Sequence, residues 1–211
     1  MSKTVSKDSK FWDRFAHKYS LNPIPNQRIY EEKLALTQQY FKPEMNVLEF
    51  GCGTGSTAII HAPHVKHIKA TDFSQNMIAI AKKKAADKNI QNITFECAEI
   101  KDFDEQKEQF DLILGLNILH LLEDQEKTLS KVFSLLKPGG VFVSSTACLQ
   151  NHTFLKLLKY VAPIGHFFGL LPLVKVFSKD ELIRLHEKVG FKEEVTWSPE
   201  PIALFMIAKK D

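Results

Sequence analysis

The feature that most constrains this chain is a short apolar run that ends at an acid and opens into three alternate glycines. The run is V-L-E-F at residues 47–50, and the glycines are Gly51, Gly53 and Gly55. The apolar residues predict a buried strand, and the glycines predict a tight turn whose bare backbone can approach a ligand. Residues 56–60 predict the start of a helix. Strand, turn and helix together indicate the first half of a nucleotide-type βα unit, although a glycine turn that binds nothing would share the pattern.

A second strand with an acid at its end supports the ligand-binding interpretation. Residues 68–72 predict this strand, and Asp72 comes 21 positions after Gly51. This matches the interval of about 20 residues at which a carboxylate of the second strand meets a ribose. Ser74 is a suitable N-cap for a following helix. One face of that helix carries Met77, Ile78, Ala81 and Ala85.

The remaining pattern predicts helices alternating with strands. The apolar stretch at 110–116 is typical of a parallel strand that is covered on both faces. A capping box at 178–181 starts a helix that Gly190 ends. Further strands are expected at 93–97, 141–143, 195–197 and 202–208, the last two as a hairpin around 198–201. Helices are expected near 12–19, 30–41 and 129–136. A turn is expected at 137–140.

Four motifs in order make the resemblance to a family specific. They are E-F-G-C-G-T-G, T-D-F-S, F-D-L-I-L-G-L-N-I-L-H and L-K-P-G-G-V-F-V, between about Phe41 and Ala147. Together they resemble the class I S-adenosylmethionine-dependent methyltransferases. The opening F-W-D-R-F-A-H-K-Y at 11–19 is similar to the first helix of small-molecule members of the quinone-biosynthesis type. The resemblance implies an α/β fold with a Rossmann-like doubly wound sheet, mostly parallel with an antiparallel C-terminal hairpin strand and helices on both faces.

The same resemblance implies S-adenosyl-L-methionine as cofactor and assigns residues to it. Glu49 would hold the methionine end, and Asp72 would accept both ribose hydroxyls. Phe73 and Met77 would lie against the adenine, although Met77 equally fits plain core packing. The cofactor-binding residues expected in this way are Glu49, Gly51, Cys52, Gly53, Asp72, Phe73, Met77, Cys97, Ala98, Glu99 and Asn117.

Adenine recognition departs from the family pattern. Related enzymes often carry an acid just after the third strand, where this chain has Cys97. Glu99 or the backbone near Ala98 would take over that role. Because of this departure, a protein that binds S-adenosylmethionine without transferring a methyl group is an alternative function. A dinucleotide oxidoreductase is a further alternative, but its fingerprint requires glycine or alanine at position 56, where this chain has Ser56.

Methyl transfer from a sulfonium needs positioning more than a strong catalytic residue. Should the acceptor carry a proton of high pKa, His120 is the first candidate for the base, because imidazole titrates near neutral pH. A histidine of the surface or core is the alternative. His17, Tyr19 and His166 are candidates for the substrate side. The expected partner is a small, apolar methyl acceptor.

Composition predicts one domain: 211 residues with 44% hydrophobic content allow a sizeable core. We expect a helical cap at 1–42, a cofactor-binding core at 43–147, an apolar lid or substrate segment at 148–177, and a C-terminal helix and hairpin at 178–211. Residues 160–174 are uncharged and mostly apolar. They suit a lid over an apolar substrate, a dimer contact or core, or a membrane-surface contact.

The other features argue against several classes of function. A net charge of +3 and a single lysine triplet, Lys82-Lys83-Lys84, indicate a solvated helix face and no nucleic-acid partner. Pro63 interrupts H-x-x-H-x-x-H at 61–67, which predicts a polar loop and no metal site. Three cysteines without C-x-x-C, no signal peptide and no apolar run of about 18 residues predict a cytoplasmic protein. Both a monomer and a homodimer are compatible with the sequence. Residues 1–8 are expected to be disordered.

Overall fold

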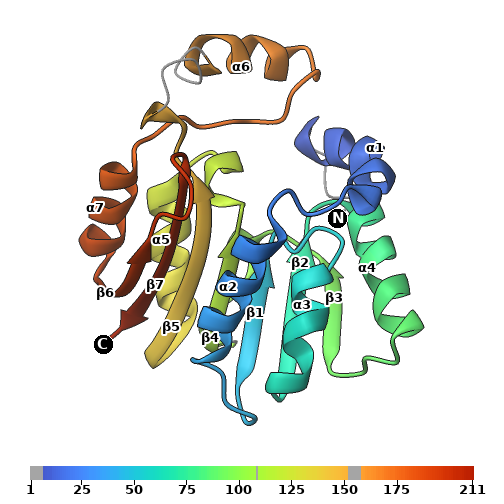
Figure 1. The fold of residues 1–211 in the computed structure, drawn as a ribbon, viewed down its shortest axis with the longest axis vertical. Coiled ribbons are helices and arrows are strands. Elements are labelled where there is room, and N and C mark those ends of the chain that lie inside the picture. The colour runs from blue at the N-terminus through green and yellow to red at the C-terminus, as the bar shows by residue number, and fades with distance from the viewer. Residues whose placement is uncertain (1–6, 108, 152–157) are drawn as a thin grey trace.

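A single mixed sheet organises the protein in the computed structural model, which describes residues 7–107, 109–151 and 158–211. Within those residues the sheet has seven strands in the order β3-β2-β1-β4-β5-β7-β6 (Figure 1). Strands β1 to β5 are parallel, whereas β7 is antiparallel to both β5 and β6. The strands are β1 (Asn46–Phe50), β2 (His67–Asp72), β3 (Ile93–Cys97), β4 (Phe110–Leu116), β5 (Leu136–Ala147), β6 (Phe191–Trp197) and β7 (Ala203–Lys210). The predicted fold class is confirmed.

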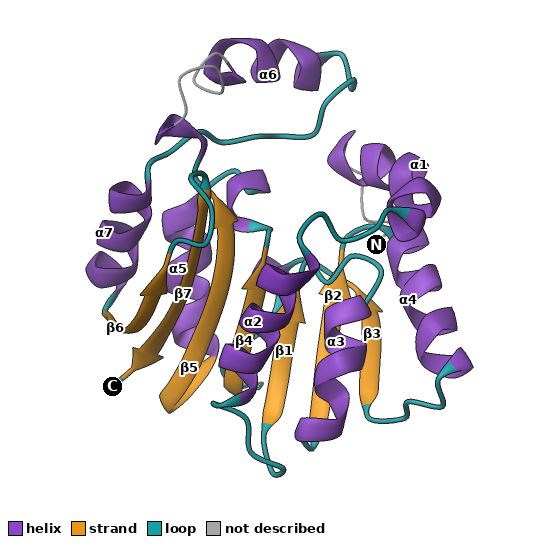
Figure 2. Ribbon diagram, viewed as in Figure 1, coloured by secondary structure: helices purple, strands orange, loops and turns teal. Residues whose placement is uncertain are grey.

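Helices cover both faces of this sheet (Figure 2). One core cluster packs α2, α3 and α4 against the sheet, and a second packs α5 and α7 against the opposite face. The apolar stripe of α4 is buried as its spacing predicts, and Ser74 accepts the expected capping hydrogen bond from the Met77 N–H. The helices are α1 (Lys7–Leu21), α2 (Gln27–Gln38), α3 (Ser56–His61), α4 (Gln75–Asp87), α5 (Gln125–Leu135), α6 (Leu158–Phe167) and α7 (Lys179–Val189).

The strand order determines where a ligand can bind. After β1 the chain continues to β2 and β3 on one side, and then returns to β4 on the other side. The carboxyl ends of β1 and β4 therefore diverge into connections that leave in opposite directions, which is the usual binding crevice of an open α/β sheet. Helices α1 and α6 both lie beyond this edge of the sheet (Figure 1).

Two predictions of local structure are wrong. The expected turn at 137–140 lies inside β5, which pairs with β4 at Leu136 and again from Val141, with a register shift between. Gly139 adopts a φ of 74° there, so a local irregularity replaces a chain reversal. At the N-terminus, α1 already begins at Lys7; residues 1–6 lie outside the described part of the chain.

Candidate active site

The glycine turn after β1 has the backbone that only glycine adopts easily. Gly51, Gly53 and Gly55 all have positive φ, at 66°, 52° and 72°. Their bare Cα atoms serve different purposes. A Cβ on Gly51 would lie 2.7 Å from Ile118, and one on Gly55 would lie 2.7 Å from Phe95, so both glycines allow close packing. A Cβ on Gly53 would meet only a Tyr19 carbon, at 3.7 Å. Gly53 is therefore the glycine whose surface stays open for a ligand.

Asp72, at the end of β2, is bonded to this turn. One of its carboxylate oxygens accepts the Gly53 N–H at 3.0 Å, and the other accepts the Ser74 N–H at 2.9 Å. The side chain is buried, which raises its pKa, while these backbone hydrogen bonds act in the opposite direction. Each carboxylate oxygen keeps a further lone pair, so Asp72 can hold the loop and also accept a hydroxyl.

Glu49, the acid within β1, is more completely buried than Asp72 and has fewer hydrogen-bond partners. It is 3% exposed, and its Oε2 has no hydrogen-bond partner among the residues that the structure describes. Burial, together with the nearby negative charge of Asp72, raises its pKa to about 8. A buried carboxylate oxygen without a partner is costly, so this position favours a ligand that brings a cation or a donor.

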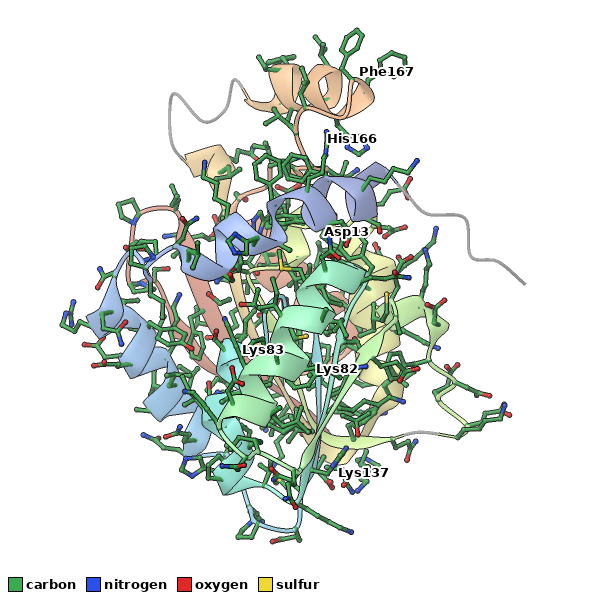
Figure 3. All side chains as sticks on the ribbon, turned by 90° about the vertical axis from the view of Figure 1, so that its right-hand side faces the viewer. Asp13, Lys82, Lys83, Lys137, His166 and Phe167 are labelled. Atoms are coloured by element: carbon green, nitrogen blue, oxygen red, sulfur yellow. The ribbon has the colours of Figure 1, made fainter. Side chains whose placement is uncertain are left out.

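The glycine turn, Glu49 and Asp72 form the floor of the site. Helix α1 lies over this floor and is held there by Asp13. The Asp13 carboxylate accepts the Ser74 hydroxyl at 2.6 Å and the Asn76 N–H at 3.1 Å, at the start of α4 (Figure 3). This places Tyr19 of α1 next to Gly53. Burial raises the pKa of the Tyr19 hydroxyl, as do the charges of Asp72 and Glu49, so the phenol stays protonated.

These elements enclose a cavity of about 1420 Å³ at the carboxyl edge of the sheet. Most of the residues predicted for the site line it, and they come from strand ends, loops and α1 as well as from the segment after β5. The predicted residues on its wall are Tyr19, Glu49, Gly51, Cys52, Gly53, Asp72, Phe73, Met77, Ala98, Glu99, Asn117 and His166.

Three predicted residues are not on the wall. Cys97 donates its thiol hydrogen to the Phe73 carbonyl oxygen at 3.4 Å, and so supports the backbone directly after Asp72. His120 lies beside the cavity with a buried Nδ1 that has no partner within the described residues, and burial lowers its pKa to about 4. His17 is exposed on α1. The geometry therefore does not bring these three side chains to the cavity.

Lys84 reaches the cavity although the lysine triplet was expected to be a solvated face. Its ammonium donates to the Thr54 hydroxyl at 2.9 Å and to the Ser56 hydroxyl at 3.2 Å. Lys82 and Lys83 are exposed, as expected (Figure 3). The triplet interpretation is wrong for Lys84 because position 84 follows Met77 by seven residues and so belongs to the inward face of α4. Helical spacing from Met77 is the sequence signal that identifies the inward position of Lys84.

The predicted polar loop of histidines is also only partly correct. His61 ends α3 and is fully buried, with its ring 4.8 Å from the ring of Phe41. Burial, with a smaller effect of His64, lowers the pKa of His61 to about 4. Across residues 7–107, 109–151 and 158–211 there is no cluster of three or more side chains suited to holding a metal ion.

The segment after β5 closes the cavity from above. Asp8 of α1 accepts the Leu173 N–H at 3.1 Å and lies 3.4 Å from the His166 ring nitrogen. Arg14 donates to the Gly169 carbonyl oxygen at 2.9 Å. Leu173 and His166, together with Pro172, line the cavity, so part of the 160–174 stretch forms its roof.

Comparison with known families identifies the class of protein. A model described as "Methyltransferase domain" matches residues 41–189, more than half of the chain. The chain belongs to this methyltransferase family. Its fold is that of the class I S-adenosylmethionine-dependent methyltransferases, and S-adenosylmethionine is the family's cofactor. The match decides against the dinucleotide oxidoreductase.

Individual relatives agree with this membership. The ubiquinone biosynthesis O-methyltransferase of Coxiella burnetii is 28% identical over 137 residues, which cover 65% of this chain and 57% of that protein. The malonyl-[acyl-carrier protein] O-methyltransferase of Priestia megaterium is 29% identical over 196 residues, covering 89% and 66%. The chain thus spans less than two thirds of the length of both. The N-methyltransferase NodS of Bradyrhizobium japonicum, crystallised with S-adenosyl-l-homocysteine, has a similar fold, with a TM-score of 0.74 and 20% identity over 97% of this chain and 99% of that one.

Proposed function

We propose that this chain transfers a methyl group from S-adenosylmethionine to a small, apolar acceptor in the cavity between the β1 turn and the α1–α6 roof. The observation that carries the proposal is the bare carboxylate oxygen of Glu49, buried beside Asp72 and the open Gly53. The cofactor brings a positively charged amino group, two ribose hydroxyls and a sulfonium. Two carboxylates in a cavity wall are the complement to that set of groups.

The residues fit the cofactor in the following way. Glu49 takes the amino end of the methionine part and is neutralised by it. Asp72 accepts the ribose hydroxyls with its remaining lone pairs. Gly53 lets the backbone approach, and Phe73 and Met77 lie on the adenine side. When bound, S-adenosylmethionine supplies a methyl group that its positive sulfur already activates.

The adenine and methionine ends have further candidates on the wall. Ala98 and Glu99 follow β3 and line the cavity, so they are available to read the adenine edge in place of the acid that Cys97 replaces. Cys52 and Gly51 complete the turn, and Asn117 offers backbone groups at the end of β4. The supporting fact is their common position on one cavity.

The roof excludes water and orients the acceptor. Tyr19 presents a neutral hydroxyl, which can donate a hydrogen bond to an acceptor oxygen or nitrogen. Pro172 and Leu173 give the roof an apolar surface. His166 is the histidine on the wall, whereas a His120 with a pKa near 4 would be a weak base at neutral pH. The assignment of His120 stays a prediction.

Relatives support the acceptor class. The name of one of them, the ubiquinone biosynthesis O-methyltransferase, refers to a quinone compound. An apolar roof over a cavity of about 1420 Å³ suits such a ring with part of its side chain. We therefore place quinols and related phenols first among the acceptors, ahead of amines, thiols and fatty acids.

Calorimetric titration with S-adenosylmethionine tests the cofactor site. Asp72→Ala is expected to weaken binding at least about fivefold, because a charged acceptor of hydrogen bonds is lost. Asp72→Asn removes the charge but keeps one acceptor oxygen for the Gly53 or the Ser74 N–H, so it loosens the loop less than alanine does. Asp87→Ala, an exposed acid on α4, is the matched control. An unchanged dissociation constant in Asp72→Ala would remove the ribose assignment.

An assay with a labelled methyl donor tests the acceptor. Quinols, phenols, amines, thiols and fatty acids are offered in parallel with a protein extract and RNA. Transfer to a quinol or phenol supports the proposal. Transfer to protein or RNA, with every small apolar acceptor failing, contradicts it. Tight S-adenosylmethionine binding with no transfer to any acceptor would indicate a binding protein.

A further inference from the structure

Most of the apolar side chains in and directly after α6 face solvent and do not line the cavity. Only His166, Pro172 and Leu173 of residues 158–174 line the cavity. The large apolar side chains that face solvent in the same stretch are Tyr160 (71% exposed), Val161 (55%), Ile164 (61%), Phe167 (68%), Phe168 (68%), Leu170 (71%) and Leu171 (37%). A contiguous exposed surface of this kind marks a contact with a partner or a lipid surface. We call these seven exposed side chains the α6 patch.

The orientation of α6 separates the two faces. His166 points toward α1, where its ring lies 3.4 Å from Asp8, whereas Phe167 projects away from the body of the protein (Figure 3). Helix α6 stands at the far end of the molecule, beyond the sheet (Figure 1). Its ten residues are too few to span a bilayer. No helix within the described ranges has both the length and the apolarity for a membrane crossing.

The charges around the patch select among possible occupants. The described residues 158–178 include no acidic residue, whereas they include Lys159 and Lys175. Lys159 is exposed within α6. Arg14 is also exposed, and its bond to the Gly169 carbonyl oxygen brings a further cation to the patch. A second copy of this chain would bring like charges together, whereas an anionic lipid surface complements them.

We propose that the α6 patch docks on an anionic lipid bilayer, with α6 lying flat in the interface. Aromatic and aliphatic side chains enter the headgroup boundary, and Lys159 and Arg14 meet lipid phosphates. The contact of His166 with Asp8 joins α6 to α1, and the bonds of Asp8 with Leu173 and of Arg14 with Gly169 join the segment after α6 to the same helix, so the patch and the cavity roof are parts of one layer. The inference concerns a surface outside the catalytic cavity and does not rest on the identity of the acceptor.

Vesicle flotation tests the proposal with the full chain. The vesicles are phosphatidylcholine alone and phosphatidylcholine mixed with phosphatidylglycerol. We expect binding to the mixed vesicles, weaker binding to the neutral ones, and a decrease as salt rises. The double substitution Phe167→Ser and Phe168→Ser is expected to reduce binding at least about tenfold, and Lys159→Gln about fivefold. Ile60→Ser removes an exposed apolar side chain from α3 and is the matched control, with unchanged binding expected.

Three results would overturn the proposal. They are no binding to the mixed vesicles, equal binding by the double variant, and a dimer in light scattering that the double variant abolishes. The last would reassign the patch to self-association. Unchanged S-adenosylmethionine binding by the double variant shows that the fold and the cofactor site are intact. A failed acceptor assay would leave vesicle binding unaffected, so the two proposals fail separately.

Discussion

Replacing Glu49 by glutamine is expected to stabilise the ligand-free protein while it weakens cofactor binding. The ionised carboxylate of Glu49 is disfavoured in the folded state, because burial and the charge of Asp72 raise its pKa from 4.5 to about 8. Below pH 4.5 the group is protonated in both states and costs nothing. Between pH 4.5 and 8 the folded protein keeps the proton on Glu49, whereas the unfolded chain loses it. The free energy of unfolding therefore falls as the pH rises through this range. Glutamine at position 49 has no such dependence.

The magnitude follows from the displacement of the pKa. A shift from 4.5 to about 8 corresponds to at most about 5 kcal/mol at pH 8 and above. Water in the cavity screens part of this cost, so we expect Glu49→Gln to gain about 1–3 kcal/mol at pH 8 and nothing at pH 4.5. For a chain of this length, that gain raises Tm by about 2–10 °C.

Thermal unfolding from pH 4.5 to 8.5, without cofactor, measures the effect. Glu193→Gln, an exposed acid on β6, is the control and should change the free energy of unfolding by less than about 0.5 kcal/mol. Calorimetry then tests the role of Glu49 in binding. Wild-type protein at pH 7 should release about one proton on binding S-adenosylmethionine, and Glu49→Gln should release none and bind about tenfold more weakly. A variant that is less stable than wild type at pH 8 would refute the reasoning.

Three further substitutions test other parts of the structure. Gly55→Ala combines a positive φ with a Cβ placed 2.7 Å from Phe95, so calorimetric unfolding should show a loss of about 2–4 kcal/mol. Gly53→Ala has free space for its Cβ and should lose cofactor affinity in titration with less change in Tm than Gly55→Ala. His61 is buried and neutral, so wild-type stability should fall as the pH drops from about 6.5 toward 4. His61→Phe keeps the ring beside Phe41 and should flatten that decline in acid unfolding curves.

The part of the site that sequence could predict is the part built from adjacent residues. The strand, the glycine turn and the acid at the end of β2 are short patterns whose geometry follows from local rules, and the structure brings Glu49, Gly53 and Asp72 together. The sheet order depends on alternation of strands with helices and on the terminal hairpin, which were also visible. These features need no knowledge of distant contacts.

The remaining features depend on contacts between distant residues. Nothing local in α1 shows that Asp13 bonds to Ser74, 61 positions later, and so places Tyr19 over the glycine turn. His61 occupies a polar sequence pattern, but its side chain turns inward against Phe41. The stretch at 137–140 has the composition of a turn, yet the pairing of β5 with β4 carries the strand through it. Tertiary packing outweighed local preference in each case.

The floor and the roof of the cavity are held by different kinds of interaction, and we expect them to differ in rigidity for that reason. The floor consists of paired strand ends and of the glycine turn, which the Asp72 carboxylate ties to β2 by accepting the Gly53 and Ser74 N–H groups, so it is rigid and suited to the constant part of the reaction, the cofactor. The roof is joined to α1 by a few contacts, among them those of Asp8 with Leu173 and His166 and that of Arg14 with Gly169. A few polar bonds open at far lower cost than a sheet. The roof is therefore the part that we expect to move when an acceptor enters, and its outer side carries the α6 patch, with which we propose that the protein docks.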